Sequence, residues 1–434
     1  MISFLSLMGI ITTIMTIFGI NNILTSQPTS IAPYVYYLNF KPESDKVLQE
    51  LAKLYMEETG IEVTVFSPPS GTYGETLKKE ITSSKPPTLF VEGGFQYLSE
   101  YANNIYDLTE TKVANELSTD DYKLIDSNGK LAGIGYCYET FGLIVNKELL
   151  EKSGHKIDEI KNFNTLKKVV EDIHFNANKL GFDAFTSIGL DSSSSWRFSG
   201  HLSNVPLFYE SRDDLTWKET PENIRGTYLK NYKNLWDLYI NNSPYSPNTL
   251  STGGYNAEEE FGQKKVVFYQ NGNWEYDALV NNYKLEPNSL TMIPLYSGVE
   301  GEENAGLNSG TENYWVVNKK AHEKAIEATL EFMYWLVTST KATKKLATTF
   351  GYIPFKKGVA PDNVFLSKAN QLKSEGKYTM LWTFNLTPNV DEWRKNLVDA
   401  LNEYSIDNSD EKWELVKKAF VEGWAEQYEI QQSK

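Results

Sequence analysis

A strand–helix–strand pattern at residues 35–66 is the feature that most constrains how this chain can fold. Val35–Phe40 is rich in β-branched and aromatic residues and predicts a first strand, while residues 61–66 alternate in polarity and predict a second. Between them apolar residues recur at helical spacing, with Pro42 where a helix begins and Gly60 just past its end. This order implies two parallel strands in one sheet, so we expect an α/β protein.

The length and charge of the chain narrow its possible classes. At 434 residues it exceeds one ordinary core and favours two domains, and 41% hydrophobic residues indicate a globular protein. The formal net charge of −15 argues against nucleic acid and anionic membrane surfaces as partners. Aromatic residues make up 13% of the chain, including 27 Tyr and 10 Trp, which suits a protein that stacks on flat apolar faces.

Cysteine and histidine usage gives little support to metal or cofactor chemistry. Cys137 is the single cysteine, which excludes an intramolecular disulfide, a Cys-rich zinc site and a CxxC redox motif. The four histidines are not at ligand spacing from one another: His155, His174, His201 and His322. We therefore expect no metal, no cofactor and no Ser-His-Asp triad.

The N-terminus differs in kind from the rest of the chain. Residues 1–24 are apolar and uncharged, and the first lysine is Lys41. As a helix this segment would span roughly 36 Å, enough for a bilayer core of about 30 Å. We interpret it as an export signal or an uncleaved anchor, with residues 25–33 as a tether, although it has no basic leader and no lipobox cysteine. A buried helix is the alternative.

Two glycine-marked, extended segments, residues 133–147 and 306–319, are suited to cross between lobes and act as hinges. The turn-rich stretch 350–357 predicts a further return of the chain. The expected division is 1–33 as signal or anchor and tether, 34–138 plus 307–356 as the N-terminal lobe, and 139–306 plus 357–434 as the C-terminal lobe.

The stretch Phe268–Tyr276 gives the first candidate for a binding site. The apolar run before it predicts a strand, Asn-Gly-Asn predicts a sharp turn that the glycine permits, and Trp274 follows at once. Ligands of open α/β sheets lie beyond the carboxyl ends of strands. A core tryptophan is the alternative, but the polar neighbours Asn271 and Asn273 favour a site.

Further candidates follow other predicted strands. Trp196 and Arg197 come after a run of serines, an arrangement that favours an exposed, functional placement of Trp196 over a core role. Asn39 and Lys41 lie in the loop after the first strand. Glu92 ends the third predicted strand beside two glycines, where a solvated carboxylate and a ligand contact are equally plausible.

The order of these motifs resembles the family 1 extracellular solute-binding proteins of bacterial ABC importers, the maltose-binding-protein-like class. The resemblance covers residues from about 35 to 428. It is carried by Thr59–Val63, Pro86–Phe90, Gly142–Lys147 with Leu149–Gly154, Asn271–Trp274, Tyr314–Lys319 and Gly351–Pro354. Each motif alone is weak, and their order and spacing together are fairly specific.

This resemblance implies a two-lobed periplasmic-binding-protein fold of type II, with a mostly parallel sheet in each lobe and crossing hinge segments. It implies an exported, monomeric protein at the outer face of the cytoplasmic membrane or in the periplasm. Membrane contact would be made only through the N-terminal segment. An oligosaccharide would be captured between the lobes and delivered to ABC permease subunits, with no covalent chemistry.

By motif position the resemblance also implies site residues. Trp274 corresponds to the stacking residue after the Asn-Gly turn, Glu139 to a carboxylate that bonds sugar hydroxyls, and Trp196 to an aromatic surface of the second lobe. Where the maltose binder has an Asp-Arg pair, this sequence has Glu92 and Gln96, so maltose itself is not expected. The remaining expected contacts are Asn39, Lys41, Tyr73, Arg197, Asn273, Trp315, Trp382 and Trp393.

Two rival functions share these residues. An extracellular glycoside hydrolase would use a pair of carboxylates such as Glu92 and Glu139, but 57 acidic residues make a candidate pair easy to find. A sugar sensor would keep the fold and signal its closure to a membrane receptor. The favoured expectation is an oligosaccharide-binding protein, because indole faces and paired hydrogen-bonding groups suit a sugar ring.

Overall fold

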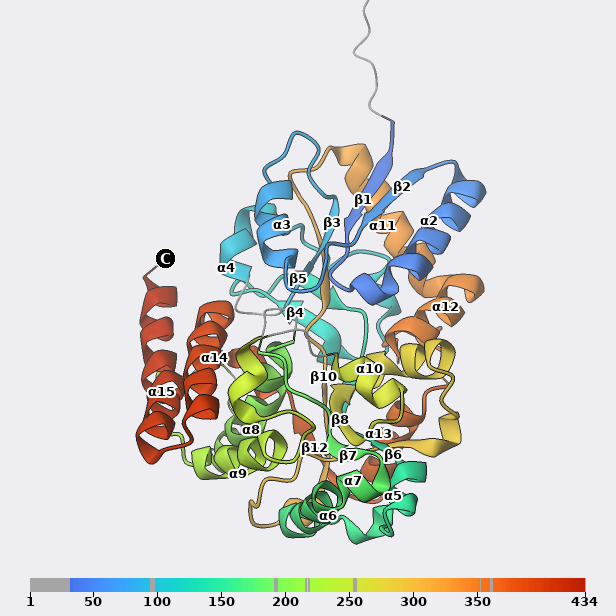
Figure 1. The fold of residues 1–434 in the computed structure, drawn as a ribbon. Helices are drawn as coiled ribbons and strands as arrows, with labels where there is room; N and C mark the ends of the chain where they lie inside the picture. Colours follow the sequence, from blue (N-terminus) through green and yellow to red (C-terminus); the bar gives the residue numbers. More distant parts are fainter. Residues whose placement is uncertain are drawn as a thin grey trace, which may run out of the picture.

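The computed structural model shows two lobes, each built around a six-stranded sheet with helices packed against it (Figure 1). Blue and cyan segments with two orange helices form the first lobe, and green, yellow and red segments form the second. The structure describes residues 32–93, 98–190, 194–214, 217, 219–252, 256–351, 353–359 and 362–433.

The first sheet has the strand order β2-β1-β3-β11-β5-β4. Its strands are β1 (Tyr34–Leu38), β2 (Glu62–Phe66), β3 (Leu89–Glu92), β4 (Lys123–Ile125), β5 (Leu131–Gly135) and β11 (Tyr314–Val317). The helices of this lobe are α2 (Asp45–Thr59), α3 (Tyr73–Glu80), α4 (Leu98–Tyr101), α11 (Glu323–Thr338) and α12 (Thr340–Phe350).

The strand–helix–strand opening is confirmed. β1 and β2 pair in parallel, with Val35 opposite Val63, and α2 connects them. Pro42 starts a short 3₁₀ turn that leads into α2, and Gly60 ends the helix in the left-handed region at φ 73°. These two residues fix where the helix starts and stops, and the apolar face between them packs into the first core.

The second sheet has the order β12-β10-β6-β8-β7, with β9 also paired to β6. Its strands are β6 (Glu139–Asn146), β7 (Asp183–Phe185), β8 (Val266–Gly272), β9 (Leu290–Ile293), β10 (Ala305–Gly310) and β12 (Tyr378–Leu381). Its helices are α5 (Lys147–Lys152), α6 (Phe163–Phe175), α7 (Ala177–Leu180), α8 (Ser203–Asp213), α9 (Leu229–Ile240), α10 (Ala257–Gly262), α13 (Val364–Ser374), α14 (Val390–Ile406) and α15 (Asp410–Gln432). Helices α14 and α15 pack side by side at the outer edge of this lobe (Figure 1).

Both predicted crossings are present. The chain leaves the first sheet after β5 and enters the second with β6, and it returns from β10 of the second sheet to β11 of the first. The two-lobed α/β fold is therefore confirmed, but the sheets are mixed rather than mostly parallel. β6 runs antiparallel to β8, β9 and β10, and β11 runs antiparallel to β3 and β5, because strands that cross between lobes enter against their neighbours.

The expected lobe boundary at residue 307 falls inside β10, which pairs with β6 and β12 of the second sheet. We propose placing this boundary in the segment 311–313, between β10 and β11, and keeping the other divisions as expected. The predicted signal or anchor at residues 1–24 lies outside the described residues. In the part of the chain that is described, no helix combines the length and apolar character needed to span a bilayer.

Gly142 in β6 gives a test of the second sheet. A Cβ at this position would collide with the carbonyl oxygen of Ile293 in β9 and crowd Leu307 and Met292. We expect Gly142→Ala to lower the free energy of unfolding by about 1–3 kcal/mol, since an extra methyl in a packed interior forces backbone shifts. Urea denaturation measures this change.

Gly74 in α3 is the matched control, because a Cβ there meets nothing within 4 Å. Gly74→Ala should leave stability unchanged or raise it by up to about 1 kcal/mol, as alanine favours helix. Equal stability of Gly142→Ala and the parent protein would contradict the close packing of β6 on β9.

Candidate functional site

A buried ion pair connects the two lobes. Lys41 lies in the loop after β1, and its Nζ is 2.9 and 3.0 Å from the two carboxylate oxygens of Glu139, the first residue of β6. Asn313, in the returning segment, donates to Glu139 Oε2 at 3.4 Å, and Glu43 is 3.7 Å from Lys41 Nζ. Burial alone would lower the pKa of Lys41, but the Glu139 and Glu43 carboxylates raise it above its ordinary value. Lys41 is therefore positively charged throughout the physiological range.

Asn39 holds the loop that carries Lys41. Its side chain is buried, donates to the Lys41 carbonyl at 2.6 Å and to the Ser44 and Ser67 hydroxyls, and accepts from the Lys41 backbone N–H at 3.2 Å. Asn39 was expected to contact a ligand. Because its donors and acceptor serve the loop, the structure makes it a positioning residue for Lys41.

An aromatic cluster lies beside this ion pair. The Trp274 and Trp196 rings are 6.1 Å apart, and His201 lies 5.5 Å from Trp274 and 4.9 Å from Trp196. Lys41 Nζ is 5.6 Å from the centre of the Trp274 ring, a cation–π distance. We use the name interlobe site for the following six residues: Lys41, Glu139, Trp196, His201, Trp274 and Glu275.

His201 is fixed as a neutral ring. Phe141 of β6 stacks on it at 3.9 Å, and the side-chain amide of Gln270 pairs with its Nδ1 at 3.0 Å. Burial, with further contributions from the Arg394 and Arg197 charges, holds the pKa of His201 well below its ordinary value. His201 therefore presents an uncharged aromatic face to the two tryptophans.

Gly272 explains why Trp274 occupies its position, for a different reason from the one expected. The sequence predicted a sharp turn permitted by glycine, yet Gly272 has ordinary extended dihedral angles, φ −119° and ψ −177°. A Cβ at residue 272 would collide with the Trp274 indole. Glycine is required because the indole packs directly on the end of β8, which leaves Trp274 half-buried just beyond the strand.

Glu275 is the most perturbed carboxyl of the interlobe site. Burial is the main cause, and together with the nearby Glu258 it raises the pKa of Glu275 from an ordinary 4.5 to about 8, while Arg197 opposes the shift. Asn271 donates to Glu275 Oε1 at 2.9 Å. Glu275 Oε2 is buried and has no partner within hydrogen-bond distance among the described residues, although the Tyr269 hydroxyl, which accepts from Asn271, is near enough to lower the pKa slightly.

Arg197, which was expected to contact a ligand, is buried. Its guanidinium lies over the Phe198 and Tyr269 rings, 5.0 and 5.5 Å from their centres, and donates to the Gln270 carbonyl at 3.4 Å. Arg197 begins a π-helical segment, Arg197–Leu202, which also carries His201. Trp196 therefore lies in the aromatic cluster, whereas Arg197 bonds to the backbone of β8.

In the first lobe, Glu92 ends β3 as a buried residue whose Oε1 has no partner among the described residues. Burial, with a smaller contribution from Glu100, raises its pKa well above the ordinary value. Tyr73 contacts the same strand end, since its hydroxyl donates to the Val91 carbonyl at 2.9 Å and accepts from the Val91 N–H at 2.7 Å. Gln96 lies outside the described residues.

Four expected contacts are buried structural residues. Trp315 is stacked on Tyr136 in the first core, and Trp393 is fully buried in the second core, where its Nε1 donates to the Phe420 carbonyl. Asn273 accepts from the Thr140 N–H at 2.7 Å and so connects β8 to β6. Trp382 is buried against Gly310 and Phe141, behind the aromatic cluster rather than in it. These residues support the interlobe site without lining it.

Sequence reasoning missed His201 and the special role of Glu275. His201 lies five residues after Trp196, and the π-helical segment between them is what turns both rings to the same place. No motif in the sequence predicts such a segment. Glu275 directly follows Trp274, so its position beside a stacking residue was a usable signal.

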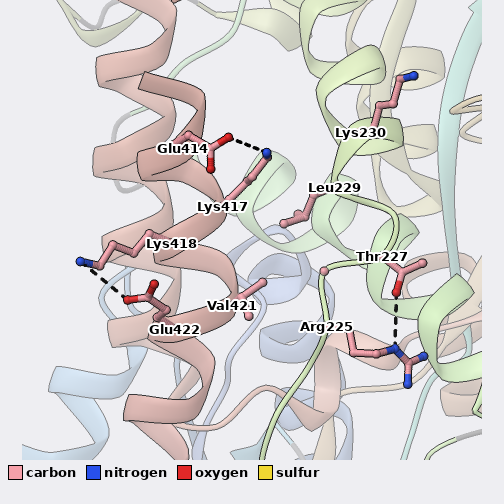
Figure 2. Close-up of a pocket in the computed structure, with 10 residues that line it drawn as sticks. Arg225, Thr227, Leu229, Lys230, Glu414, Lys417, Lys418, Val421 and Glu422 are labelled. Atoms are coloured by element: carbon pink, nitrogen blue, oxygen red, sulfur yellow. Dashed lines mark hydrogen bonds and ion pairs between the residues drawn. The ribbon is translucent and has the colours of Figure 1, made fainter. Parts of the chain in front are cut away.

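A separate surface hollow of about 450 Å³ lies between the start of α9 and α15 (Figure 2). Arg225, Lys230, Lys417 and Lys418 surround it with Glu414 and Glu422. Lys417 pairs with Glu414 at 2.6 Å and Lys418 with Glu422 at 3.7 Å, so much of the basic charge is neutralised locally. The hollow shares no residue with the interlobe site and has no aromatic lining, and we assign it no role.

The fold and the interlobe site define a two-lobed solute-binding protein. Residues 50–374 match the profile of the family described as "Bacterial extracellular solute-binding protein", and the chain belongs to that family. No curated protein sequence matches the chain.

Solved structures with the same fold come from several bacteria. The protein RafE in complex with raffinose has a TM-score of 0.68 and 17% identity, over 91% of this chain and 99% of that chain. Maltose-bound MalE3 of T. maritima has a TM-score of 0.66 and 15% identity, over 92% and 100%. A structure from work on xylan utilization by Caldanaerobius polysaccharolyticus has a TM-score of 0.65 and 20% identity, over 90% and 99%.

The raised pKa of Glu275 predicts a pH-dependent stability. Between about pH 5 and pH 8 the native carboxyl keeps a proton that the unfolded chain releases, so stability falls as pH rises, by up to about 1.4 kcal/mol per pH unit for one proton. Glu275→Gln cannot titrate and should remove the part of this slope that Glu275 contributes, while other buried carboxyls such as Glu92 keep theirs. Denaturant unfolding of both proteins across this pH range measures it. Parallel pH profiles for the two proteins would contradict the assignment.

Proposed function

We propose that this protein captures an oligosaccharide between its lobes and delivers it to the permease of an ABC importer. The observation that supports this proposal is the interlobe site. In it the aromatic rings of Trp196, His201 and Trp274 from the second lobe lie beside the Lys41 ammonium group from the first. Its location would be the outer face of the cytoplasmic membrane or the periplasm, and it would act as a monomer attached, if at all, through its N-terminal segment.

The chemistry of a sugar ring fits these groups. A pyranose has faces of C–H bonds and an edge of hydroxyls, so indole faces cover the former at low entropic cost. Carboxyl and amide groups such as Glu275 and Asn313 exchange hydrogen bonds with the latter. Two tryptophans 6.1 Å apart offer more aromatic area than one ring needs, which favours an oligosaccharide over a monosaccharide.

Capture would proceed by closure of the two lobes around the crossing segments. A ligand shifts a two-state equilibrium only by contacts that it makes better in one state. Lys41 is suited to this role, because it comes from the first lobe yet contacts Glu139 and the Trp274 ring of the second. Solute oxygens that reach Lys41 and the tryptophans together would favour the closed state.

The names of structural relatives agree with this proposal at the level of ligand class. RafE is described in complex with raffinose and MalE3 as maltose-bound. At 14–20% identity these likenesses establish the fold alone. A sensor that passes lobe closure to a membrane receptor would use the same fold and site.

Glycoside hydrolysis by Glu92 and Glu139 is less well supported. Both carboxylate oxygens of Glu139 lie within 3.0 Å of Lys41 Nζ, so its charge is neutralised by a fixed partner. A nucleophile or base in this position would first have to lose that ion pair.

Trp274→Ala tests saccharide capture. In thermal unfolding with raffinose, maltotriose, xylotriose and chitotriose, a ligand at one hundred times its Kd should add roughly 2.7 kcal/mol to the stability of the parent protein. We expect the variant to bind at least about thirtyfold more weakly, the loss that follows from removing a central aromatic contact worth about 2 kcal/mol.

Trp217→Ala is the matched control. Trp217 is also half-buried, but it packs near Trp424 in the outer part of the second lobe. It should keep the parent affinity. If none of the saccharides shifts the transition, the proposed ligand class is wrong, and equal binding by both tryptophan variants would exclude the interlobe site.

Chromatography of the same oligosaccharides after long incubation tests the hydrolase alternative. We expect intact sugar with the parent protein and with Glu139→Gln alike, because neither is proposed to do covalent chemistry. Products that form with the parent protein and disappear with Glu139→Gln would replace binding by hydrolysis as the function.

A further inference from the structure

Arg394 is a half-buried cation with hydrogen-bond donors that the described part of the chain does not use. It lies near the start of α14. Its guanidinium makes no hydrogen bond or ion pair with any residue that the structure describes, and its Nε is buried. A buried polar group without a partner destabilises the fold, and an unpaired charge does so more strongly. Such groups therefore occur mainly where a ligand or a bound water completes them.

Arg394 lies at the same edge of the second sheet as the interlobe site. Strands β8, β10 and β12 run in one direction, since β6 is antiparallel to β8 and β10, and β12 is parallel to β10. Trp274 follows the carboxyl end of β8, and the turn that contains Phe384 follows the carboxyl end of β12, shortly before α14. Ligands of α/β sheets lie beyond the carboxyl ends of strands, so both ends of this edge are suited to contact a solute.

Packing contacts connect the two ends of this edge. The His201 ring lies 5.5 Å from the Trp274 ring and 6.4 Å from the Phe384 ring. The Arg394 guanidinium is 5.5 Å from the centre of the Phe384 ring. It also packs against Gly200, the residue before His201, where a Cβ would lie 3.1 Å from Nη2. The row of rings that starts at Trp274 therefore continues past His201 to Arg394, an arrangement that suits two or more linked sugar units.

The segment 311–313, which crosses between the lobes, adjoins the Arg394 end of this row. Asn385, next to Phe384, donates to the Thr311 carbonyl at 3.0 Å. Glu312 interacts electrostatically with Arg394, although the two form no ion pair. Burial raises the pKa of Glu312, whereas the Arg394 and Lys41 charges oppose this shift. Because a raised pKa weakens Glu312 as a counter-ion, the donors of Arg394 remain available to a solute between the lobes.

Arginine is rare in this chain, and only four of its 42 basic residues are arginines: Arg197, Arg212, Arg225 and Arg394. The first donates to the Gln270 carbonyl, and the next two form ion pairs with Asp213 and Asp214. A guanidinium presents two parallel N–H groups on one edge, which match the two oxygens of a carboxylate, whereas a lysine ammonium is a point charge. The unpartnered Nε of Arg394 belongs to such an edge.

We propose that Arg394 is a specificity-determining contact that binds the carboxylate of a uronic acid unit, in an oligosaccharide whose neutral unit stacks on Trp274. This inference rests on the proposed function and adds the charge class of its solute. The Nε–H and one Nη–H of Arg394 donate to the two carboxylate oxygens. The solute carboxylate in turn supplies the negative charge that the half-buried guanidinium lacks.

The charges at the other end of the row explain why the acidic unit belongs beside Arg394. Lys41, the cation over Trp274, already pairs with Glu139 and has Glu43 nearby. Glu275 directly follows Trp274 and adds a further carboxyl there. A uronate on Trp274 would meet these acidic groups without an unpaired cation, whereas a neutral ring avoids that cost. A single uronate at the Arg394 end therefore fits best.

Calorimetric titration of the full protein with matched pairs of ligands tests this inference. The acidic ligands are the aldotriuronic acid in which glucuronic acid is linked to xylobiose, and a hyaluronan tetrasaccharide. Each is paired with its own form in which the carboxyl is reduced to the alcohol. We expect the parent protein to bind one acid about 10- to 100-fold more tightly than its reduced form, the ratio that hydrogen bonds to a charged group provide. Arg394→Gln should bind the two forms about equally, because the carboxylate has lost its partner.

Arg225→Gln is the matched control for the loss of one arginine charge. Arg225 is exposed, pairs with Asp214 and borders the separate surface hollow, so this variant should keep the preference of the parent protein for the acid. Arg394→Lys is the conservative variant. It keeps the charge without the planar pair of donors and should retain only part of the preference.

The outcomes separate this inference from the proposed function. Equal affinity of the parent protein for the acid and reduced forms, or an acid preference that survives in Arg394→Gln, would overturn this inference alone. Binding of neutral saccharides without binding of either acid would also overturn it. Loss of the preference in Arg225→Gln would place the carboxylate in the surface hollow and overturn it as well. Absence of binding by every saccharide, neutral or acidic, would overturn the proposed function together with it.

Discussion

The buried ion pair between Lys41 and Glu139 is the interaction on which the arrangement of the two lobes depends. Removing two charges from water is costly, and their attraction compensates only when the geometry is good and the remaining hydrogen-bonding capacity is satisfied. The chain meets both conditions, since Lys41 reaches both carboxylate oxygens, Asn313 completes Glu139, and the Asn39 network holds the loop in place. Breaking this contact would leave two buried charges unpaired, so the pair favours the relative placement of the lobes in this structure.

Much of the fold could be predicted from sequence because it follows from local residue patterns. Apolar periodicity, Pro42 and Gly60 define the first strand–helix–strand unit, and the glycine-marked segments mark both crossings. What local patterns do not encode is strand direction within a sheet. β6 pairs with β8, β9 and β10, and each of these strands lies more than a hundred residues after β6 in the chain. The mixed character of the sheets follows from such distant pairings.

The site was only partly predictable for the same reason. Trp274, Trp196 and Lys41 could be predicted because each comes after a strand, whereas Glu139 was expected only from the family resemblance. Whether a tryptophan lines a site or fills a core depends on which helix packs behind it. Trp393 lies in α14 and is covered by α15, whereas Trp315 lies in β11 and is covered by Tyr136. The position of His201 in the site could not be predicted from sequence, because it depends on a π-helical segment.

The discontinuity of both sheets also governs the order in which the chain can acquire structure. The central strand β11 of the first sheet comes at residues 314–317, and β12 of the second at 378–381. During synthesis from the N-terminus, neither core can close until most of the chain has emerged, and contacts so far apart in sequence form slowly. A polypeptide with this topology cannot complete either core early in its synthesis. That property suits a protein whose chain has to pass through a narrow membrane channel before it folds.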